Sequence, residues 1–152
     1  MKEKFSIRGN VLIEVCNAVT GHVEHAVHCT NAVPTAGANA FRDAMGGFAL
    51  FPAGIGGGTS NTAFADSDIA LGNEVIRKPI SRRIRPRDGA IRFQAFVLET
   101  EGNNNTLAEA GLFNSSTLKS GQLMARFTHP TILKTSSVFL TYTWEWEFLV
   151  NL

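Results

Sequence analysis

The chain has 152 residues, of which 44% are hydrophobic and 18% charged, a composition typical of one globular domain and not of a disordered chain. The formal net charge is +1, so overall electrostatics identifies no partner. Two cysteines are too few for a disulfide scaffold, and neither a secretion signal nor an apolar run long enough to span a bilayer is visible. We therefore expect a single domain over residues 1–152, made in a cytoplasm, with no membrane partner.

The first predicted element is a β-hairpin. Residues 5–15 alternate between apolar and polar positions, and the apolar ones share a face: Phe5, Ile7, Val11, Ile13 and Val15. A period of two is typical of a strand with one buried face. The segment 17–21 contains Asn and Gly, which favour a turn. A second strand from His22 to about Thr30 would close the hairpin. We expect Cys16 and Cys29 to stay free thiols, because they fall at different heights of this hairpin.

The pattern changes in the next part of the chain. Small and apolar residues over 34–47 predict a short helix, capped by Thr35 and ended by a pair of glycines. Residues 48–51 are predicted to form a short strand that runs into a glycine-rich loop at 54–58. A long polar segment follows at 59–72, and a connection of this length inside a compact domain usually serves an interface.

The last half of the chain predicts strand after strand. Three shorter ones are expected at 90–98, 107–113 and 123–127. The final strand has the clearest pattern, with an unbroken apolar face made by Val138, Leu140, Tyr142, Trp144, Trp146, Phe148 and Val150. Its other face carries Thr141, Thr143, Glu145 and Glu147. Many short strands with Gly and Asn turns indicate an all-β fold. We predict a mainly antiparallel β-sandwich, jelly-roll-like, with one short α-helix.

Strand geometry and residue spacing argue against metal and phosphate sites. His22 and His28 are roughly 20 Å apart along a strand, whereas a zinc ion needs ligands within about 2 Å. The glycine-rich segment lacks the Gly-Lys-Ser/Thr ending of a phosphate-binding loop. Asp66, Asp68 and Glu74 lack the spacing of a calcium loop. We expect no metal and no cofactor.

Catalytic arrangements are equally weak. Glu145 and Glu147 share a face and are a conceivable glycosidase pair, but two carboxylates on an exposed strand are ordinary. No Ser-His-Asp or Cys-His arrangement has local support. We predict that the protein is not an enzyme.

The strongest electrostatic feature is a basic run that only Asp88 opposes locally: Arg77, Lys78, Arg82, Arg83, Arg85, Arg87 and Arg92. Arginine binds phosphate and carboxylate groups equally well, through its planar fork. A solvated strand edge, protected from aggregation by charge, is the alternative interpretation. The run has no aromatic residues between its charges, which disfavours a single-stranded nucleic acid. We favour protein contact or a solvated edge over nucleic acid.

Two stretches resemble small virion proteins of tailed bacteriophages. The first joins Gly56-Gly57-Gly58-Thr59 to residues 66–77, and is similar to a pattern G-x-G-T, spacer, D-x-x-L-x-x-E-x-x-R. The second joins residues 107–113 to 121–126, and is similar to E-x-G-L-F, turn, G-x-L-x-A-R. Lys134-Thr135 and the final strand complete the order, so the resemblance covers most of the chain. Within it, we hypothesise that Glu109 is an inward carboxylate that meets Arg126 or Arg77.

The resemblance implies a homo-oligomer, most simply a trimer, that binds the major capsid protein or other virion proteins. As a capsid cement or decoration protein it would bridge neighbouring capsomers on the capsid surface, after synthesis in the cytoplasm of a bacterial host. A tail, baseplate or collar adaptor is the alternative. A carbohydrate-binding sandwich is more remote, because Tyr142, Trp144 and Trp146 fall on the face predicted to be buried. We expect partner contacts at the basic run and at the 54–69 loop, including Gly56, Gly57 and Gly58.

Overall fold

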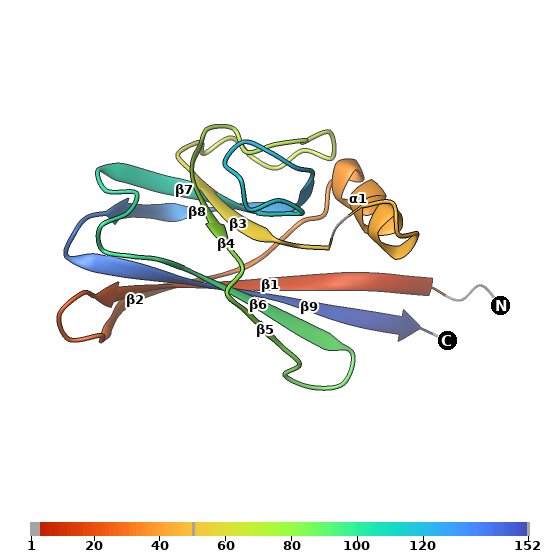
Figure 1. The fold of residues 1–152 in the computed structure, drawn as a ribbon, viewed down its shortest axis with the longest axis horizontal. Coiled ribbons are helices and arrows are strands. Elements are labelled where there is room, and N and C mark those ends of the chain that lie inside the picture. Colours follow the sequence, from red (N-terminus) through yellow and green to blue (C-terminus); the bar gives the residue numbers. More distant parts are fainter. Residues whose placement is uncertain (1–3, 50, 152) are drawn as a thin grey trace.

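The computed structural model describes residues 4–49 and 51–151, which form two antiparallel sheets packed face to face (Figure 1). The five-stranded sheet has the order β2–β1–β9–β6–β5, with bounds β1 Lys4–Asn17, β2 Val23–Thr30, β5 Arg82–Ile84, β6 Ala90–Val97 and β9 Val138–Asn151. The four-stranded sheet has the order β4–β3–β7–β8, with bounds β3 Gly54–Gly58, β4 Glu74–Pro79, β7 Asn105–Phe113 and β8 Leu123–Lys134. One helix, α1, spans Thr35–Met45. The prediction of an all-β sandwich with one short helix is confirmed.

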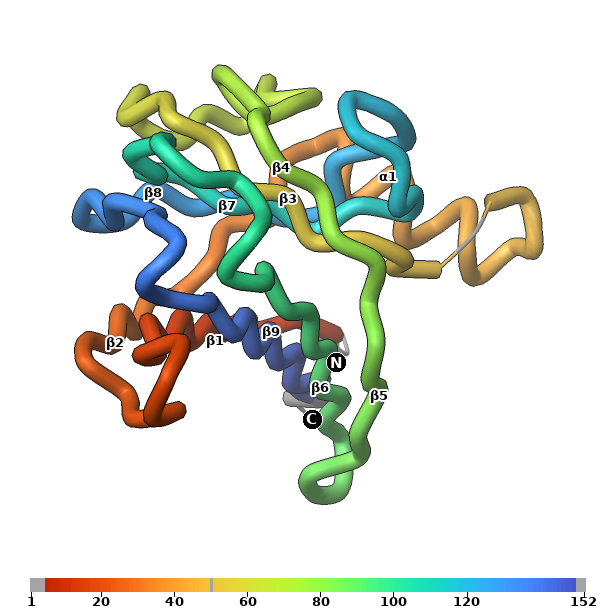
Figure 2. The backbone as a smooth tube through the Cα atoms, turned by 60° about the vertical axis from the view of Figure 1, so that its left-hand side comes forward, coloured from red at the N-terminus to blue at the C-terminus, as the bar shows by residue number. Residues whose placement is uncertain are grey.

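Whole hairpins, rather than single strands, alternate between the two sheets. The β1–β2 and β5–β6 pairs belong to the first sheet, and the β3–β4 and β7–β8 pairs to the second. The chain passes from β4 directly into β5 at the edge of the other sheet (Figure 2). The last strand, β9, then inserts between β1 and β6 and pairs with β1 along its whole length. The two ends of the chain therefore lie at the same end of the sandwich (Figure 1).

The core lies between the sheets, and β9 contributes its largest side chains. Tyr142, Trp144 and Trp146 are buried there, as the alternation predicted. Phe127 packs edge-on against Trp144, with ring centres 5.4 Å apart. The predicted continuation of this face at Val150 falls on a side chain outside those described. Because aromatic side chains bury large apolar areas, this row contributes strongly to hydrophobic stabilisation.

The helix α1 packs against β8, at the edge of the four-stranded sheet. Gly37 lies so close to β8 that a Cβ there would collide with the carbonyl oxygen of Met124. Only glycine permits that approach. The predicted cap by Thr35 is wrong, because Pro34 occupies the cap position and no side chain caps the helix. The Thr35 amide instead donates to the carbonyl of Asp66 at 3.0 Å, which ties the helix to the connection between β3 and β4.

The glycine-rich segment is a strand and not a loop. Gly54–Gly58 forms β3, which is buried along its length between β4 and β7. A Cβ on Gly56 would lie 2.8 Å from the Glu74 carboxylate, and one on Gly58 would lie 2.6 Å from the Asn73 carbonyl oxygen. The glycines make room for charged side chains that cross the sheet. The predicted strand at 48–51 is also wrong: Phe48 and Ala49 lie in a bend after α1, and Leu50 lies outside the described residues.

Other strands are longer than predicted or were not predicted. β8 runs to Lys134, beyond the predicted end at Phe127. The polar stretch that holds the basic run contains two strands, β4 and β5, which its composition did not predict. Cys16 and Cys29 are free, as expected. In the part of the chain that the structure describes, no helix combines the length and apolarity needed to cross a membrane.

Candidate functional site

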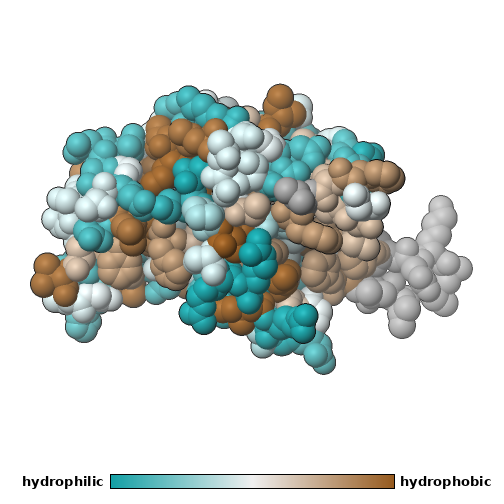
Figure 3. Space-filling model, viewed as in Figure 1, coloured by the Kyte–Doolittle hydropathy of each residue, from teal (hydrophilic) through white to brown (hydrophobic). Residues whose placement is uncertain are grey.

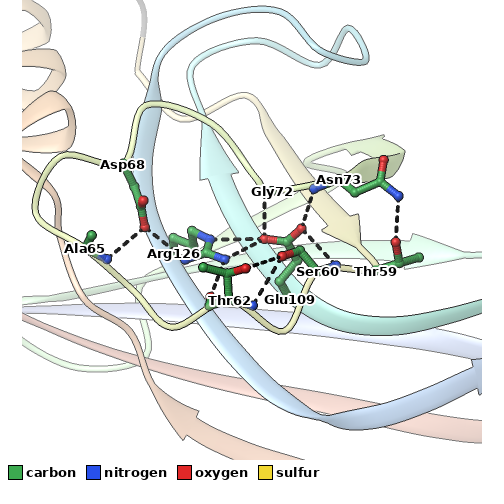
Figure 4. Close-up of polar contacts among 9 residues, drawn as sticks. All are labelled: Thr59, Ser60, Thr62, Ala65, Asp68, Gly72, Asn73, Glu109 and Arg126. Atoms are coloured by element: carbon green, nitrogen blue, oxygen red, sulfur yellow. Dashed lines mark hydrogen bonds and ion pairs between the residues drawn. The ribbon is translucent and has the colours of Figure 1, made fainter.

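The connection between β3 and β4, residues 59–73, is held by an ion pair that lies inside the protein (Figure 4). Glu109 in β7 has no solvent exposure, and Arg126 in β8 is only 2% exposed. The Nε and Nη2 atoms of Arg126 donate to Oε2 of Glu109 at 3.0 and 2.9 Å. The hypothesised meeting of Glu109 with Arg126 is therefore present, while Arg77 has a different partner.

The Glu109 carboxylate also accepts hydrogen bonds from both ends of this 59–73 loop. The Ser60 amide donates to Oε1 at 3.3 Å, the Asn73 amide to Oε1 at 2.9 Å, and the Gly72 amide to Oε2 at 3.0 Å. A buried carboxylate is costly unless its oxygens are satisfied. Here five donors surround the two oxygens, so the charge is compensated and the loop ends are fixed beside each other.

Arg126 holds the middle of the same loop. Its Nη1 donates to Oδ2 of Asp68 at 2.9 Å, and its Nη2 donates to the carbonyl of Thr62 at 2.8 Å. Asp68 in turn accepts from the Ala65 amide at 3.0 Å. Figure 4 shows the guanidinium between the Asp68 and Glu109 carboxylates. One arginine therefore connects a strand to a loop that has no regular structure of its own, which fixes the shape that the loop presents to solvent.

A second buried ion pair holds the 114–122 turn. Arg77 pairs with Glu74 through its Nε, and its Nη1 donates to the carbonyls of Ser115 and Ser120 at 2.7 and 3.0 Å. The Arg77 guanidinium also stacks on the Phe113 ring, 3.5 Å from its centre. Because the Arg77 side chain is 1% exposed, its predicted role as a partner contact is wrong.

The rest of the basic run is divided, not gathered into one patch. Lys78, in β4 of the second sheet, pairs with Glu101 at 2.5 Å. Across the first sheet, both Arg87 and Arg92 pair with Glu145, at 2.6 and 2.8 Å. The run crosses between the sheets, so its members point in different directions. Asp88 is the only acidic residue within the run, but Glu101 and Glu145, which lie outside it in the sequence, reach Lys78, Arg87 and Arg92 in the fold.

These partly exposed pairs alter the acidity of their carboxylates. The hydrogen bond from Lys78 lowers the pKa of Glu101. Partial burial raises the pKa of Glu145, but hydrogen bonds from Arg87 and Arg92 outweigh it and lower that pKa. Both groups remain accessible to solvent, so each pair makes a small contribution to stability.

Three exposed arginines of the run, Arg82, Arg83 and Arg85, form no ion pair with any residue that the structure describes. Arg83 donates to the carbonyl of Pro52 at 2.7 Å. The predicted contact surface therefore narrows to β5 and the residue after it. Gly56, Gly57 and Gly58 are buried in β3, so the prediction that they contact a partner is not supported by this arrangement.

The outer face of the five-stranded sheet has a shallow groove of about 480 Å³ lined by polar side chains and one leucine: Asn10, Leu12, Glu14, His28, Arg92, Gln94, Thr143 and Glu145. Aromatic platforms that would stack on a sugar are not among these residues. Within residues 4–49 and 51–151, no group of three or more His, Cys, Asp or Glu side chains is placed to hold a metal ion.

Exposed apolar side chains gather around α1 and the segment after it. Phe5 is 56% exposed, and Met45, Phe48 and Phe51 are exposed as well. Figure 3 shows apolar surface, in tan to brown, over this end of the molecule. One hint of this surface is visible in the composition, which has 11 Phe and only 1 Tyr. The residues could not be located from sequence, since they do not share one periodic element.

No protein-family model, no curated protein and no solved structure matches the chain.

Proposed function

We propose that this protein is a non-enzymatic structural component of a tailed-phage particle, and that it acts as a capsid cement protein that bridges neighbouring capsomers. The observation that carries the proposal is the 59–73 loop, which Glu109 and Arg126 hold in one shape from inside the protein. The two segments that meet there are those that resemble small virion proteins.

A fixed loop suits a protein that works by contact. An interface that must order a long loop loses part of its binding free energy to conformational entropy. The buried pairs Glu109–Arg126 and Glu74–Arg77 order the 59–73 loop and the 114–122 turn before any partner arrives. Buried ion pairs of this kind add little net stability compared with apolar packing, and their best-attested use is to specify one arrangement.

The surface offers two further features that a partner would cover. One is the apolar group around α1, which includes Phe48 and Phe51. Exposed apolar clusters on a folded chain commonly mark interaction sites. The other is the unpaired basic group at β5, namely Arg82, Arg83 and Arg85. Aromatic and arginine side chains are enriched at protein interfaces, so both features support contact with virion proteins over contact with nucleic acid or membrane.

The proposed mechanism is mass action. A protein that binds the assembled lattice, but not its separated subunits, shifts the equilibrium toward the intact shell. A specific interface buries roughly 800 Å² on each partner, and the whole chain exposes 8212 Å². A chain of this size therefore has enough surface to contact two capsomers and a further copy of itself at the same time.

The test compares phage heads prepared with and without this chain. Heads that lack it are expected to release their DNA at a lower temperature, and purified protein added back should restore the wild-type temperature. The Val19→Asp variant, altered at an exposed turn position away from the surfaces named above, serves as a matched control and should restore it equally. Equal heat resistance with and without the chain would rule out the cement role. If the chain is then found at the tail or collar, the adaptor alternative replaces it.

A further inference from the structure

One end of the sandwich carries a continuous aromatic and basic surface. β1 and β9 run on toward the chain ends, beyond the four-stranded sheet, and α1 lies over this extension (Figure 1). Phe5 stacks on Phe148 with ring centres 5.9 Å apart, and both rings pack against Phe41 of α1. Phe41 also contacts Trp146 edge-on at 6.3 Å. We call Phe5, Phe41, Trp146, Phe148 and Arg85 the open-end strip.

The apolar half of the strip contains a groove of about 250 Å³ between β1 and α1, lined by Phe5, Phe41, Trp146 and neighbouring residues. The volume is sufficient for one branched aliphatic side chain. Trp146 is 3% exposed, and its indole Nε1 has no hydrogen-bond partner among the described residues. Buried indole N–H groups normally have an acceptor. The groove is lined mainly by apolar side chains and therefore fits a polypeptide segment that brings an apolar side chain.

The basic half of the strip continues from Phe148. A depression of about 410 Å³ joins Phe148 to Ile91 and Arg85. Arg85 is exposed and forms no ion pair with any described residue. The nearby carboxylates Glu145 and Glu147 are already engaged by Arg87. The exposed Asp88 also lines this depression, but no ion pair joins it to Arg85 among the described residues. The Arg85 guanidinium is therefore available to a carboxylate from outside the chain.

The chain carries a matching surface on the 59–73 loop. Ile69 is 75% exposed, and the exposed Asp66, three residues earlier, forms no side-chain hydrogen bond or ion pair with a described residue. The backbone between them is fixed by Asp68 and Arg126. The loop thus presents an aliphatic side chain and a free carboxylate together. These two groups complement the apolar groove and the arginine of the open-end strip.

We infer that copies of this chain associate head to tail, with Ile69 of one copy in the groove of the next and Asp66 beside that copy's Arg85. The two contacting surfaces are different, so the contact repeats around a ring and closes when the rotation allows it. This inference deepens the proposed function and rests on it, because it specifies how the cement protein meets its own copies.

The first test measures the mass of the purified full chain by analytical ultracentrifugation. Wild-type protein should form a closed oligomer, and the variants Ile69→Asp and Phe5→Ser should each sediment as monomers. Val19→Asp changes an apolar residue that is 94% exposed elsewhere, and should leave the oligomer intact. Circular dichroism confirms that each variant is folded.

Mixing the two monomeric variants tests the head-to-tail arrangement. Each variant keeps one good surface, so an equimolar mixture should form dimers that cannot close. A contact between two identical strips would give a different result: Ile69→Asp would remain oligomeric, and this outcome would overturn the inference.

A charge exchange tests the pairing of Asp66 with Arg85. Asp66→Arg and Arg85→Asp should each weaken association at least tenfold, and the double variant should recover most of it. Arg82→Asp is the matched control, because Arg82 is opposite Gln94 in β6, on the outer face of the sheet, and should have little effect. Equal weakening by Arg82→Asp, or no recovery in the double variant, contradicts the pairing.

A wild-type chain that is monomeric at high concentration overturns the head-to-tail contact. It leaves the cement role intact if the chain still protects heads against heat. The reverse result, an oligomer that does not protect heads, removes the cement role and keeps the contact. The two failures are therefore distinguishable.

Discussion

Two charged side chains of this protein are buried almost completely, which is unusual for charged residues. Glu109 and Arg126 have almost no contact with solvent, and together they hold loop atoms that are distant in sequence. Removal of one partner leaves an uncompensated charge, which costs about 3–5 kcal/mol. Removal of both leaves no isolated charge, although the loop still loses its anchor.

A double-mutant cycle measures this coupling. Glu109→Ala and Arg126→Ala should each lower the free energy of unfolding by about 3–5 kcal/mol. The double variant should lose less than the sum, with a coupling of about 1–3 kcal/mol. Urea denaturation gives the three values. Additive losses would mean that the two side chains act independently, against the geometry.

His129 provides a prediction about pH. Its Nδ1–H donates to the carbonyl of Pro130 at 2.8 Å, and its Nε2 is buried with no hydrogen-bond partner among the described residues. Burial lowers the pKa of His129, against the opposing effect of nearby Glu109. Below about pH 6.5 the unfolded chain takes up a proton that the folded chain resists. Stability from this group is therefore complete above that pH and is lost as pH falls toward the folded pKa.

The comparison uses urea denaturation at pH 7.5 and 5.5. Wild-type protein should be less stable at pH 5.5, and His129→Gln should remove much of that difference. His25→Gln, at an exposed position of β2, is the control and should keep it. Glu101 and Glu145, whose pKa values are lowered, lose their contributions only as pH falls below about 4.3. An unchanged pH dependence in His129→Gln would contradict the assignment.

Among the elements, β3 has the most demanding packing. Its glycines leave space for the Glu109 and Glu74 carboxylates. Gly58→Ala places a Cβ against the Glu109 carboxylate and the Asn73 carbonyl, and should lower the free energy of unfolding by about 1–3 kcal/mol. Gly57→Ala is the matched control in the same strand, because its Cβ meets no backbone atom and no carboxylate: its nearest neighbours are the Ile76 Cγ2 methyl at 3.0 Å and the Tyr142 hydroxyl at 3.2 Å. Thermal unfolding should give the lower melting temperature for Gly58→Ala. A lower melting temperature for Gly57→Ala than for Gly58→Ala would contradict this account.

The 59–73 loop should behave as an anchored element. In Glu109→Gln the carboxylate charge is lost while the shape is kept, so the loop amides lose a charge-assisted acceptor. Hydrogen exchange at Ser60, Gly72 and Asn73 should accelerate at least tenfold. The amides of β1 and β9, which pair with each other in the other sheet, should change little. Equal acceleration in both regions would indicate general destabilisation and not loss of the anchor.

Sequence patterns predicted some elements well and missed others for physical reasons. The alternation of β9 predicted its buried face, because each side chain reports the face on which it lies. β3 has no side chains to alternate, so its glycines indicated a loop. β4 contains Glu74 and Arg77, whose charges suggest exposure, although each buries the other.

The site was predictable in part. The ordered motifs led to the hypothesis that Glu109 meets Arg126 or Arg77, and the structure pairs it with Arg126. The hydrogen bonds from Gly72 and Asn73 to Glu109 could not be predicted, because they come from the backbone and leave no mark on residue type. The open-end strip was also missed, since its residues come from β1, α1, β9 and the segment after β5, which only folding brings together.

For the whole molecule, the proposals describe a small rigid part with several contact surfaces. The sandwich fixes the 59–73 loop near the start of α1 and the open-end strip beyond it. Copies joined through these surfaces would still expose Arg82 and the outer face of the five-stranded sheet for other virion proteins. The proposed cement role requires many such copies, placed at repeated positions on the shell.

Cryo-electron microscopy of the intact particle tests this role most directly. Density for the sandwich should repeat over the capsid faces, at lattice symmetry axes. Within each group, the 59–73 loop of one copy should lie against the open-end strip of the next. Density confined to the unique vertex, in a few copies, would contradict the cement role and identify the protein as a tail or collar part.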